Sequence, residues 1–168
     1  MKRLVASALI VSFLAPTTLF AIDGYKAAYH GGSVGIFASA KGPVEGRLDN
    51  GDPDVLVLRM EGPPFAGQEL RIPYAKIEHL EYGQEVGRSV GAAIRRTALF
   101  GTFGLLTFFS KKRNRLLTVA YKDEEEKDQV AILELGNEIA RATLTIVKTR
   151  SGKEITYQDE EARKATGN

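Results

Sequence analysis

The sequence predicts a mainly β domain of the α+β class, built as a small antiparallel barrel or roll with one C-terminal helix. Most of the chain consists of short runs in which apolar and polar residues alternate, and turn residues such as Asn50-Gly51 separate these runs. Near residue 137 the apolar spacing changes to every third or fourth position, which is typical of an amphipathic helix. Neither an internal repeat nor a linker divides the chain, and its 168 residues fit one domain.

The predicted strands form two groups. The first group ends near residue 82, and the second surrounds a charged turn at 123–128, where we expect an antiparallel hairpin. Between the groups lies an apolar insertion at 86–110, which we expect to be helical. The strand ranges are 29–34, 44–49, 54–61, 69–74, 76–82, 115–122 and 129–135, with a further short strand at 153–158.

The C-terminal helix is predicted to begin at Asn137, a suitable N-cap, and to end at Gly152, a suitable terminator. Its β-branched residues lower the helix propensity, but they share one face. That face carries Ile139, Thr143, Ile146, Val147 and Arg150. From residue 159 to 168 we expect a polar, frayed tail.

The N-terminus has the layout of a secretory signal peptide. Lys2 and Arg3 precede a twelve-residue apolar run at 4–15, Pro16 ends that run, and a small residue stands at Ala21. We therefore expect cleavage after residue 21, a single mature domain at 22–158, and a periplasmic or cell-envelope location. The alternative is an uncleaved N-terminal anchor. Without cysteine, the chain has neither a lipoprotein attachment site nor a disulfide.

The most unusual feature of the mature chain is the uncharged run at 97–110 within the insertion. It contains seven large apolar side chains, whose burial would contribute about 10–20 kcal/mol in total. This exceeds the whole stability of a typical domain, so the run is not expected to lie in water. The predicted membrane or partner contacts are Leu99, Phe100, Phe103, Leu106, Phe108 and Phe109.

Basic residues flank this run on both sides. The range 86–115 contains seven basic and no acidic residues, whereas the mature chain as a whole is neutral. Such an asymmetry fits an anionic partner for the segment or an acidic face on the same molecule. The predicted head-group contacts are Arg95, Arg96, Lys111, Lys112, Arg113 and Arg115.

Three placements of the segment are possible. A single transmembrane helix is disfavoured, because fourteen residues reach roughly 21 Å against a hydrocarbon core of roughly 30 Å. The strands on both sides of the segment are also expected to share one sheet. The segment can instead pack over the barrel as core, or fold as a hairpin that dips into a membrane surface or a partner's groove.

Motifs for chemistry are weak. Gly31 to Gly35 matches G-x-S-x-G around Ser33, but the helix and parallel sheet of a hydrolase are not expected around it. His30 and His79 are far apart in sequence and lack metal-ligand spacing. The acidic run at 123–128 lacks calcium-loop spacing, and no phosphate-binding loop occurs. We therefore expect no catalysis, cofactor, metal or nucleic-acid partner; a small-molecule ligand is unknown.

Four segments give the chain a family resemblance: YHGGSV, IPYAKIEHLEYGQEVGR, FFSKKRNRLLTVAYKDEEEKDQVAILELG and RSGKEI. Across Tyr29 to Tyr157 the chain resembles a group of exported bacterial proteins of unknown function with a pleckstrin-homology-like barrel. The resemblance implies this fold and no activity. The loop after the first strand offers only Lys41 rather than a basic cluster, which argues against inositol-lipid recognition there.

The sequence thus predicts an exported, non-catalytic binding module. Its contact element is the Gly-rich apolar segment with basic flanks, and its partner is an anionic membrane surface or an envelope protein. The alternative is a soluble periplasmic module in which the segment is core and a sheet edge or barrel mouth binds protein.

Overall fold

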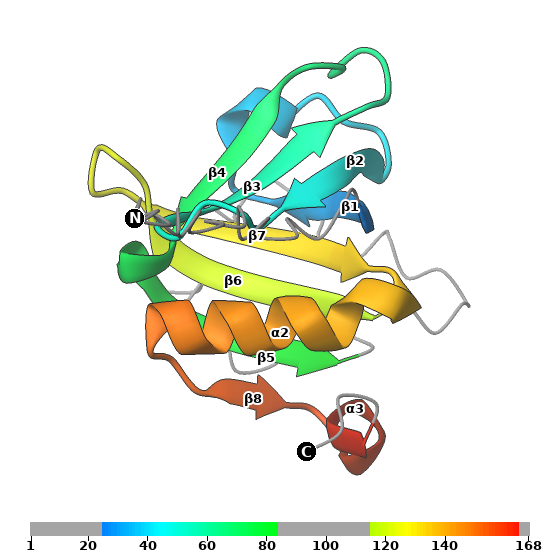
Figure 1. Ribbon diagram of the computed structural model, residues 1–168. Coiled ribbons are helices and arrows are strands. Elements are labelled where there is room, and N and C mark those ends of the chain that lie inside the picture. Colours follow the sequence, from blue (N-terminus) through cyan, green and yellow to red (C-terminus); the bar gives the residue numbers. More distant parts are fainter. Residues whose placement is uncertain (1–24, 84–114, 165–168) are drawn as a thin grey trace, which may run out of the picture.

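The computed structural model describes residues 25–83 and 115–164, which form one eight-stranded mixed sheet with helices (Figure 1). The strand order is β4-β3-β2-β1-β7-β6-β5-β8. The strands are β1 (Tyr25–Gly32), β2 (Val44–Asp49), β3 (Val55–Met60), β4 (Glu69–Pro73), β5 (Ile77–Gly83), β6 (Leu116–Lys122), β7 (Asp128–Leu135) and β8 (Ile155–Tyr157). The helical elements are η1 (Gly35–Phe37), η2 (Tyr74–Lys76), α2 (Asn137–Ser151) and α3 (Glu160–Lys164).

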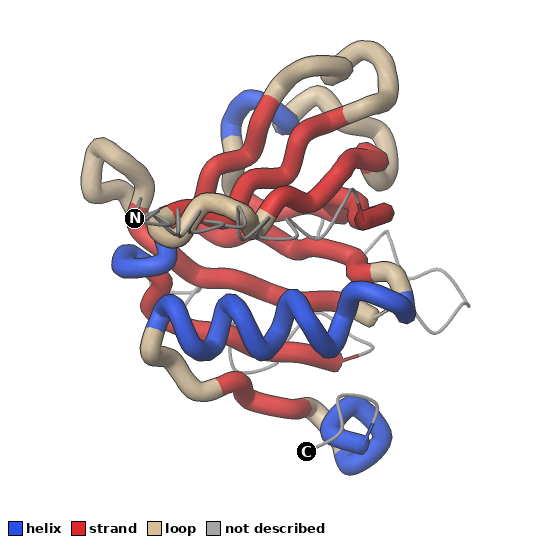
Figure 2. The backbone as a smooth tube through the Cα atoms, viewed as in Figure 1, coloured by secondary structure: helices blue, strands red, loops and turns tan. Residues whose placement is uncertain are grey.

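Two antiparallel meanders make up most of the sheet. Strands β1 to β4 form the first and β5 to β7 form the second, and the β1–β7 pairing joins them. Figure 2 shows that β2, β3 and β4 run at a steep angle to β5, β6 and β7. The sheet therefore bends strongly at β1 and β7.

Glycines at the end of β1 permit a close approach to β7. The register shifts between Tyr29 and Gly31, and Gly31 and Gly32 have φ values of 145° and 139°. A Cβ on Gly32 would lie 1.9 Å from the carbonyl oxygen of Val130. Only glycine fits this position, because both the backbone angle and the space exclude a side chain.

The hydrophobic core lies between the bent sheet and α2, which crosses in front of β5 and β6 in Figure 1. Alternation along each strand points one set of side chains into this core, including Leu117, Val119 and Tyr121 of β6. Burial raises the pKa of Tyr121 above its ordinary value. The helix contributes Ile139, Ala140, Leu144 and Val147.

Arg150 fastens the C-terminal end of α2 to the turn between β2 and β3. Its Nη1 donates hydrogen bonds to the carbonyl oxygens of Asn50 and Asp52, both at 2.6 Å. The guanidinium also lies 5.3 Å from the centre of the Tyr74 ring, within the range of a cation–π contact. This residue therefore links the helix to both the first meander and η2.

The structure confirms the mainly β class and the C-terminal helix. α2 spans Asn137–Ser151, and its N-cap is Gly136 rather than the predicted Asn137. Gly152 terminates it as predicted, with a left-handed φ of 67°. The predicted strands at 44–49, 54–61, 69–74, 76–82, 115–122 and 129–135 each match an observed strand to within one residue at either end.

Two differences concern the end of the chain. β8 pairs in parallel with β5, which an all-antiparallel prediction did not include. The sheet is open, with β4 and β8 as its edges, where a small antiparallel barrel or roll was expected. Residues 160–164 form the short helix α3 where a frayed tail was expected. Asp159 stabilises its first turn, because its Oδ1 accepts a hydrogen bond from the Ala162 N–H at 2.6 Å.

Candidate functional site

Most residues predicted to contact a membrane or partner lie outside the described residues. These are Leu99, Phe100, Phe103, Leu106, Phe108, Phe109, Arg95, Arg96, Lys111, Lys112 and Arg113. Their roles stay predictions. Arg115 is described: it precedes β6, is partly exposed, and its carbonyl oxygen accepts a hydrogen bond from the Leu135 N–H at 2.9 Å.

The two ends of the segment 84–115 lie side by side in the sheet. β5 ends at Gly83 and β6 begins at Leu116, and these two residues are partners in the antiparallel β5–β6 ladder. The residues that flank the segment therefore lie at one point of the sheet, which we call the root of the segment. A single membrane crossing would place two paired strands on opposite sides of the bilayer, so this pairing excludes it.

A buried carboxylate lies beside the root. Glu81 of β5 is 3% exposed, and its Oε1 accepts a hydrogen bond from Gln158 Nε2 at 2.9 Å. Its Oε2 is 4.0 Å from Nε2 of His79. Gly83 makes room for this arrangement, because a Cβ there would lie 2.1 Å from Oε1 of Gln158.

The sequence contained a signal for this cluster that our prediction did not use. Residues two apart on a strand share a face, so His79 and Glu81 are expected to be neighbours. The His79 side chain is 32% exposed and lies beside the buried carboxylate. The contribution of Gln158 was not predictable, because it depends on the long-range pairing of β8 with β5.

A second histidine–carboxylate pair lies between β1 and β7. Nε2 of His30 and Oε2 of Glu134 are joined by a hydrogen bond. The His30 side chain is 7% exposed, whereas that of Glu134 is 37% exposed. His30 lies at the β-bulge between Tyr29 and Gly31, where the register of β1 against β7 shifts. A bulge of this kind re-aims a side chain.

An open cleft of about 570 Å³ lies between the η1–β2 connection and the β3–β4 loop. Its apolar part is formed by prolines and Phe65, and its charged lining residues, Lys41 and Glu45, are exposed. The prolines are Pro43, Pro63 and Pro64. The cleft thus offers a rigid apolar surface with one positive and one negative side chain.

Ser33 has a structural role in tying β1 to β7. Its Oγ donates a hydrogen bond to Gln129 Oε1 at 2.6 Å and accepts one from the Val130 N–H at 2.8 Å. The three-residue element η1 follows it, and β1 pairs with antiparallel neighbours. This is not the strand–turn–helix arrangement of a hydrolase nucleophile.

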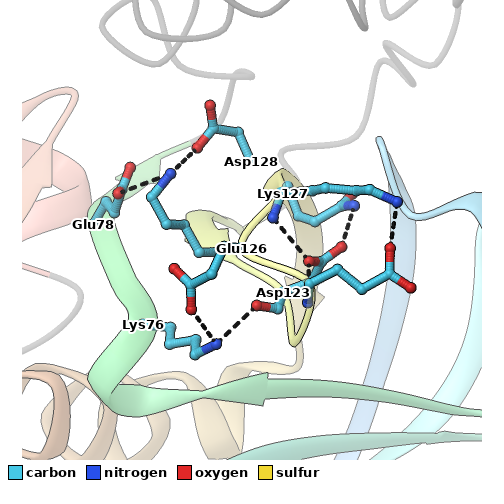
Figure 3. A network of polar contacts seen from close by, with 9 residues as sticks. Lys76, Glu78, Asp123, Glu126, Lys127 and Asp128 are labelled. Atoms are coloured by element: carbon cyan, nitrogen blue, oxygen red, sulfur yellow. Dashed lines mark hydrogen bonds and ion pairs between the residues drawn. The ribbon is translucent and has the colours of Figure 1, made fainter.

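The acidic turn between β6 and β7 is held by its own polar contacts (Figure 3). Asp123 accepts hydrogen bonds from Gln129 Nε2 and from the N–H groups of Lys127 and Glu125, at 2.9, 3.0 and 2.9 Å. These bonds, above all that from Gln129, lower the pKa of Asp123. Lys76 Nζ of η2 donates to the Asp123 carbonyl oxygen at 3.0 Å. The turn is thereby fixed to η2, directly before β5.

The outer surface of the sheet, opposite the core, differs in chemistry between its two halves. On β2, β3 and β4 it carries exposed, ion-paired side chains: Arg47 with Glu61, and Arg59 and Arg71 with Glu69. On β1, β7 and β6 it is mainly apolar, whereas β5 contributes His79, Glu81 and Gly83 to the same side. We call this second half the outer apolar face, and its residues are Ala28, Leu116, Thr118, Ala120, Val130 and Ile132.

No protein-family model and no curated protein matches this chain. Within residues 25–83 and 115–164, no group of three or more His, Asp or Glu side chains is arranged to hold a metal ion. None of the helices in these two ranges is both long enough and apolar enough to cross a membrane.

Proposed function

We propose that this protein is an exported, non-catalytic binding module of the cell envelope. It contacts an anionic membrane surface, or an envelope protein, through the Gly-rich apolar segment at 86–110 and its basic flanks. Residues 1–21 act as the export signal in this proposal, and the mature domain functions in the periplasm or at the envelope.

The root geometry is the observation that carries the proposal. Because Gly83 and Leu116 are paired, the segment between them is attached to the domain at both ends. An apolar loop of this kind can enter a membrane interface while the sheet stays on one side of it. The basic residues that flank the run on both sides would then meet the anionic head groups.

The charges of the described residues support the same partner. Seven basic side chains in the described part of the chain each form an ion pair with a carboxylate. These are Arg47, Arg59, Arg71, Lys76, Lys122, Lys127 and Lys148. By contrast, the range 86–115 contains seven basic residues and no acidic residue of its own. Its positive charge is therefore the local excess to which an anionic surface is attracted.

A pleckstrin-homology-like architecture is part of the proposal. Two antiparallel meanders joined through β1 and β7, followed by α2, support it. The open sheet departs from a closed barrel only at the β4 and β8 edges.

Flotation with liposomes tests the proposal. The mature chain (22–168) is expected to float with vesicles that contain anionic lipid, and less so as salt screens the basic flanks. The triple variant Phe100→Ser, Phe103→Ser, Phe108→Ser should remain at the bottom of the gradient while keeping its circular dichroism spectrum. A folded wild-type chain that never floats would contradict the proposal.

A matched pair of charge variants separates the basic flank from general electrostatics. Lys111→Gln, Lys112→Gln and Arg113→Gln remove three positive charges next to the root. Arg47→Gln, Arg59→Gln and Arg71→Gln remove three from the charged half of the sheet, where the side chains are exposed. We expect only the first set to weaken flotation. Equal weakening by both sets would mean that net charge, and not the segment, determines binding.

The cleft supports one alternative, a soluble periplasmic module that binds protein while the segment is core. Its prolines and Phe65 give a preformed apolar surface at the end of the first meander. In this case Lys41→Glu should abolish binding of the envelope partner, whereas the basic-flank variant should keep it. Isothermal titration with the isolated partner would measure this difference.

A further inference from the structure

The outer apolar face is continuous across β1, β7 and β6, and its rows continue onto polar residues of β5. In the ladder registers, Ile132 lies opposite Thr118, which in turn lies opposite Glu81. In the next row, Val130 lies opposite Ala120, which lies opposite His79. Because facing residues in adjacent strands lie on one side of a sheet, these side chains form a single surface.

This surface is shielded from water although it faces away from the core. Thr118 is 1% exposed, Ile132 2% and Val130 5%. Neither Ile132 nor Val130 belongs to the core cluster, which includes the buried side chains of α2. A strand buried on both faces needs a covering layer on each side. The layer that covers the outer apolar face is therefore not the helix α2, which packs on the core side.

We propose that the outer apolar face is the docking site of the chain's own apolar segment, residues 97–110. The connection of the segment argues for this occupant. The longer range 84–115, which contains this segment, is flanked by Gly83 and Leu116. These two residues belong to the row of the outer apolar face that also contains Glu134 and Ala28. The rows of Thr118 and Ala120 follow this row on the same side of the sheet. A segment connected at Gly83 and Leu116 can therefore cover them without passing to the other side.

Charge complementarity argues for the same occupant. Two carboxylates lie in the rows of the face, Glu81 opposite Thr118 and Glu134 opposite Leu116, and both are close to the root. The range 86–115 contains only basic charges, so it matches these carboxylates, whereas an acidic segment would not. The face and the segment are thus complementary in both apolar surface and charge.

Docking does not depend on the proposed membrane contact. A helix that is apolar all round has one side for the sheet and a second side for a membrane or partner. Leu99, Phe100, Phe103 and Leu106 would share one helical side, and Leu105, Phe108 and Phe109 the other. Flotation and docking can therefore succeed or fail separately.

Photo-cross-linking in the absence of lipid tests the docking. The chain has no cysteine, so Ala120→Cys introduces a single thiol on the outer apolar face, at a partly exposed position. This thiol is labelled with benzophenone-maleimide in the full chain and irradiated. Trypsin cleaves after Arg96 and Lys111, so residues 97–111 are released as one peptide, which mass spectrometry identifies.

We expect the peptide containing residue 120 to be cross-linked to the peptide 97–111. The matched control is Arg59→Cys, on the charged half of the outer surface, from which this product should be absent. A cross-link from residue 120 to residues 1–24, a cross-linked dimer, or no cross-link at all would overturn the docking. None of these outcomes decides the flotation experiment, because no membrane is present.

Discussion

Replacing Ile132 with alanine measures directly whether the outer apolar face is covered. The side chain is 2% exposed and lies outside the core cluster. Removing its three outer carbons costs about 0.8 kcal/mol for each carbon in transfer free energy alone. The cavity left in a packed site raises the usual total for such truncations to roughly 2–5 kcal/mol. We expect about 3 kcal/mol for this site.

Ile36→Ala is the matched control, because the same atoms are removed from a side chain that is 53% exposed. Its cost should stay within about 0.5 kcal/mol. Leu133→Ala, on the core side of the same strand, is the positive control, since this residue is 0% exposed. We expect it to cost as much as Ile132→Ala.

Urea denaturation of the mature chain gives the free energy of unfolding of each variant by linear extrapolation. Loss of β-propensity accounts for about 1 kcal/mol at most when isoleucine in a strand becomes alanine. A cost of less than about 1 kcal/mol for Ile132→Ala would therefore refute the reasoning, because an uncovered face loses no packing. In thermal unfolding, 3 kcal/mol corresponds to a fall of roughly 6–12 °C in Tm.

Three further substitutions test other contacts. Arg150→Ala removes the hydrogen bonds to Asn50 and Asp52 and should lower the free energy of unfolding by about 1–3 kcal/mol, as measured by urea denaturation; Arg150→Lys should recover part of this loss. Gly83→Ala places a Cβ where the Gln158 side chain lies and should destabilise the domain. In the background of Gln158→Ser the same change should cost less free energy of unfolding, which a double-mutant cycle would measure. The pKa of Asp123 is lowered in the folded state, so its contribution to stability is present above pH 3.8, the ordinary pKa, and is lost as pH falls through the lowered pKa. In Asp123→Asn, Tm measured on the acid side of pH 3.8 should therefore fall less with pH than in the wild type.

Local sequence signals predicted the individual elements well. Strict alternation between Val44 and Asp49 predicted β2, and Gly152 predicted the end of α2, because each signal depends only on neighbouring residues. The order of the strands was not predictable in the same way. Nothing between Ile155 and Tyr157 indicates that this short run pairs in parallel with β5.

The site could be predicted only in part. The apolar segment was recognisable, and the pairing of Gly83 with Leu116 confirms that the strands beside it share one sheet. The outer apolar face also had a signal that we did not use. Leu116 and Leu117 lie on opposite faces of β6, and so do Ile132 and Leu133 of β7. Consecutive large apolar residues in a strand indicate that both faces are covered.

The most direct test of the proposed membrane contact uses tryptophan, which the chain lacks. Phe108→Trp places a single fluorophore in the apolar segment, and its emission is compared between anionic vesicles with brominated acyl chains and matched vesicles without bromine. Contact with the membrane predicts quenching by the brominated lipid, which high salt reverses as the basic flanks are screened. Equal emission with both kinds of vesicle, from a folded protein at low salt, would contradict the account.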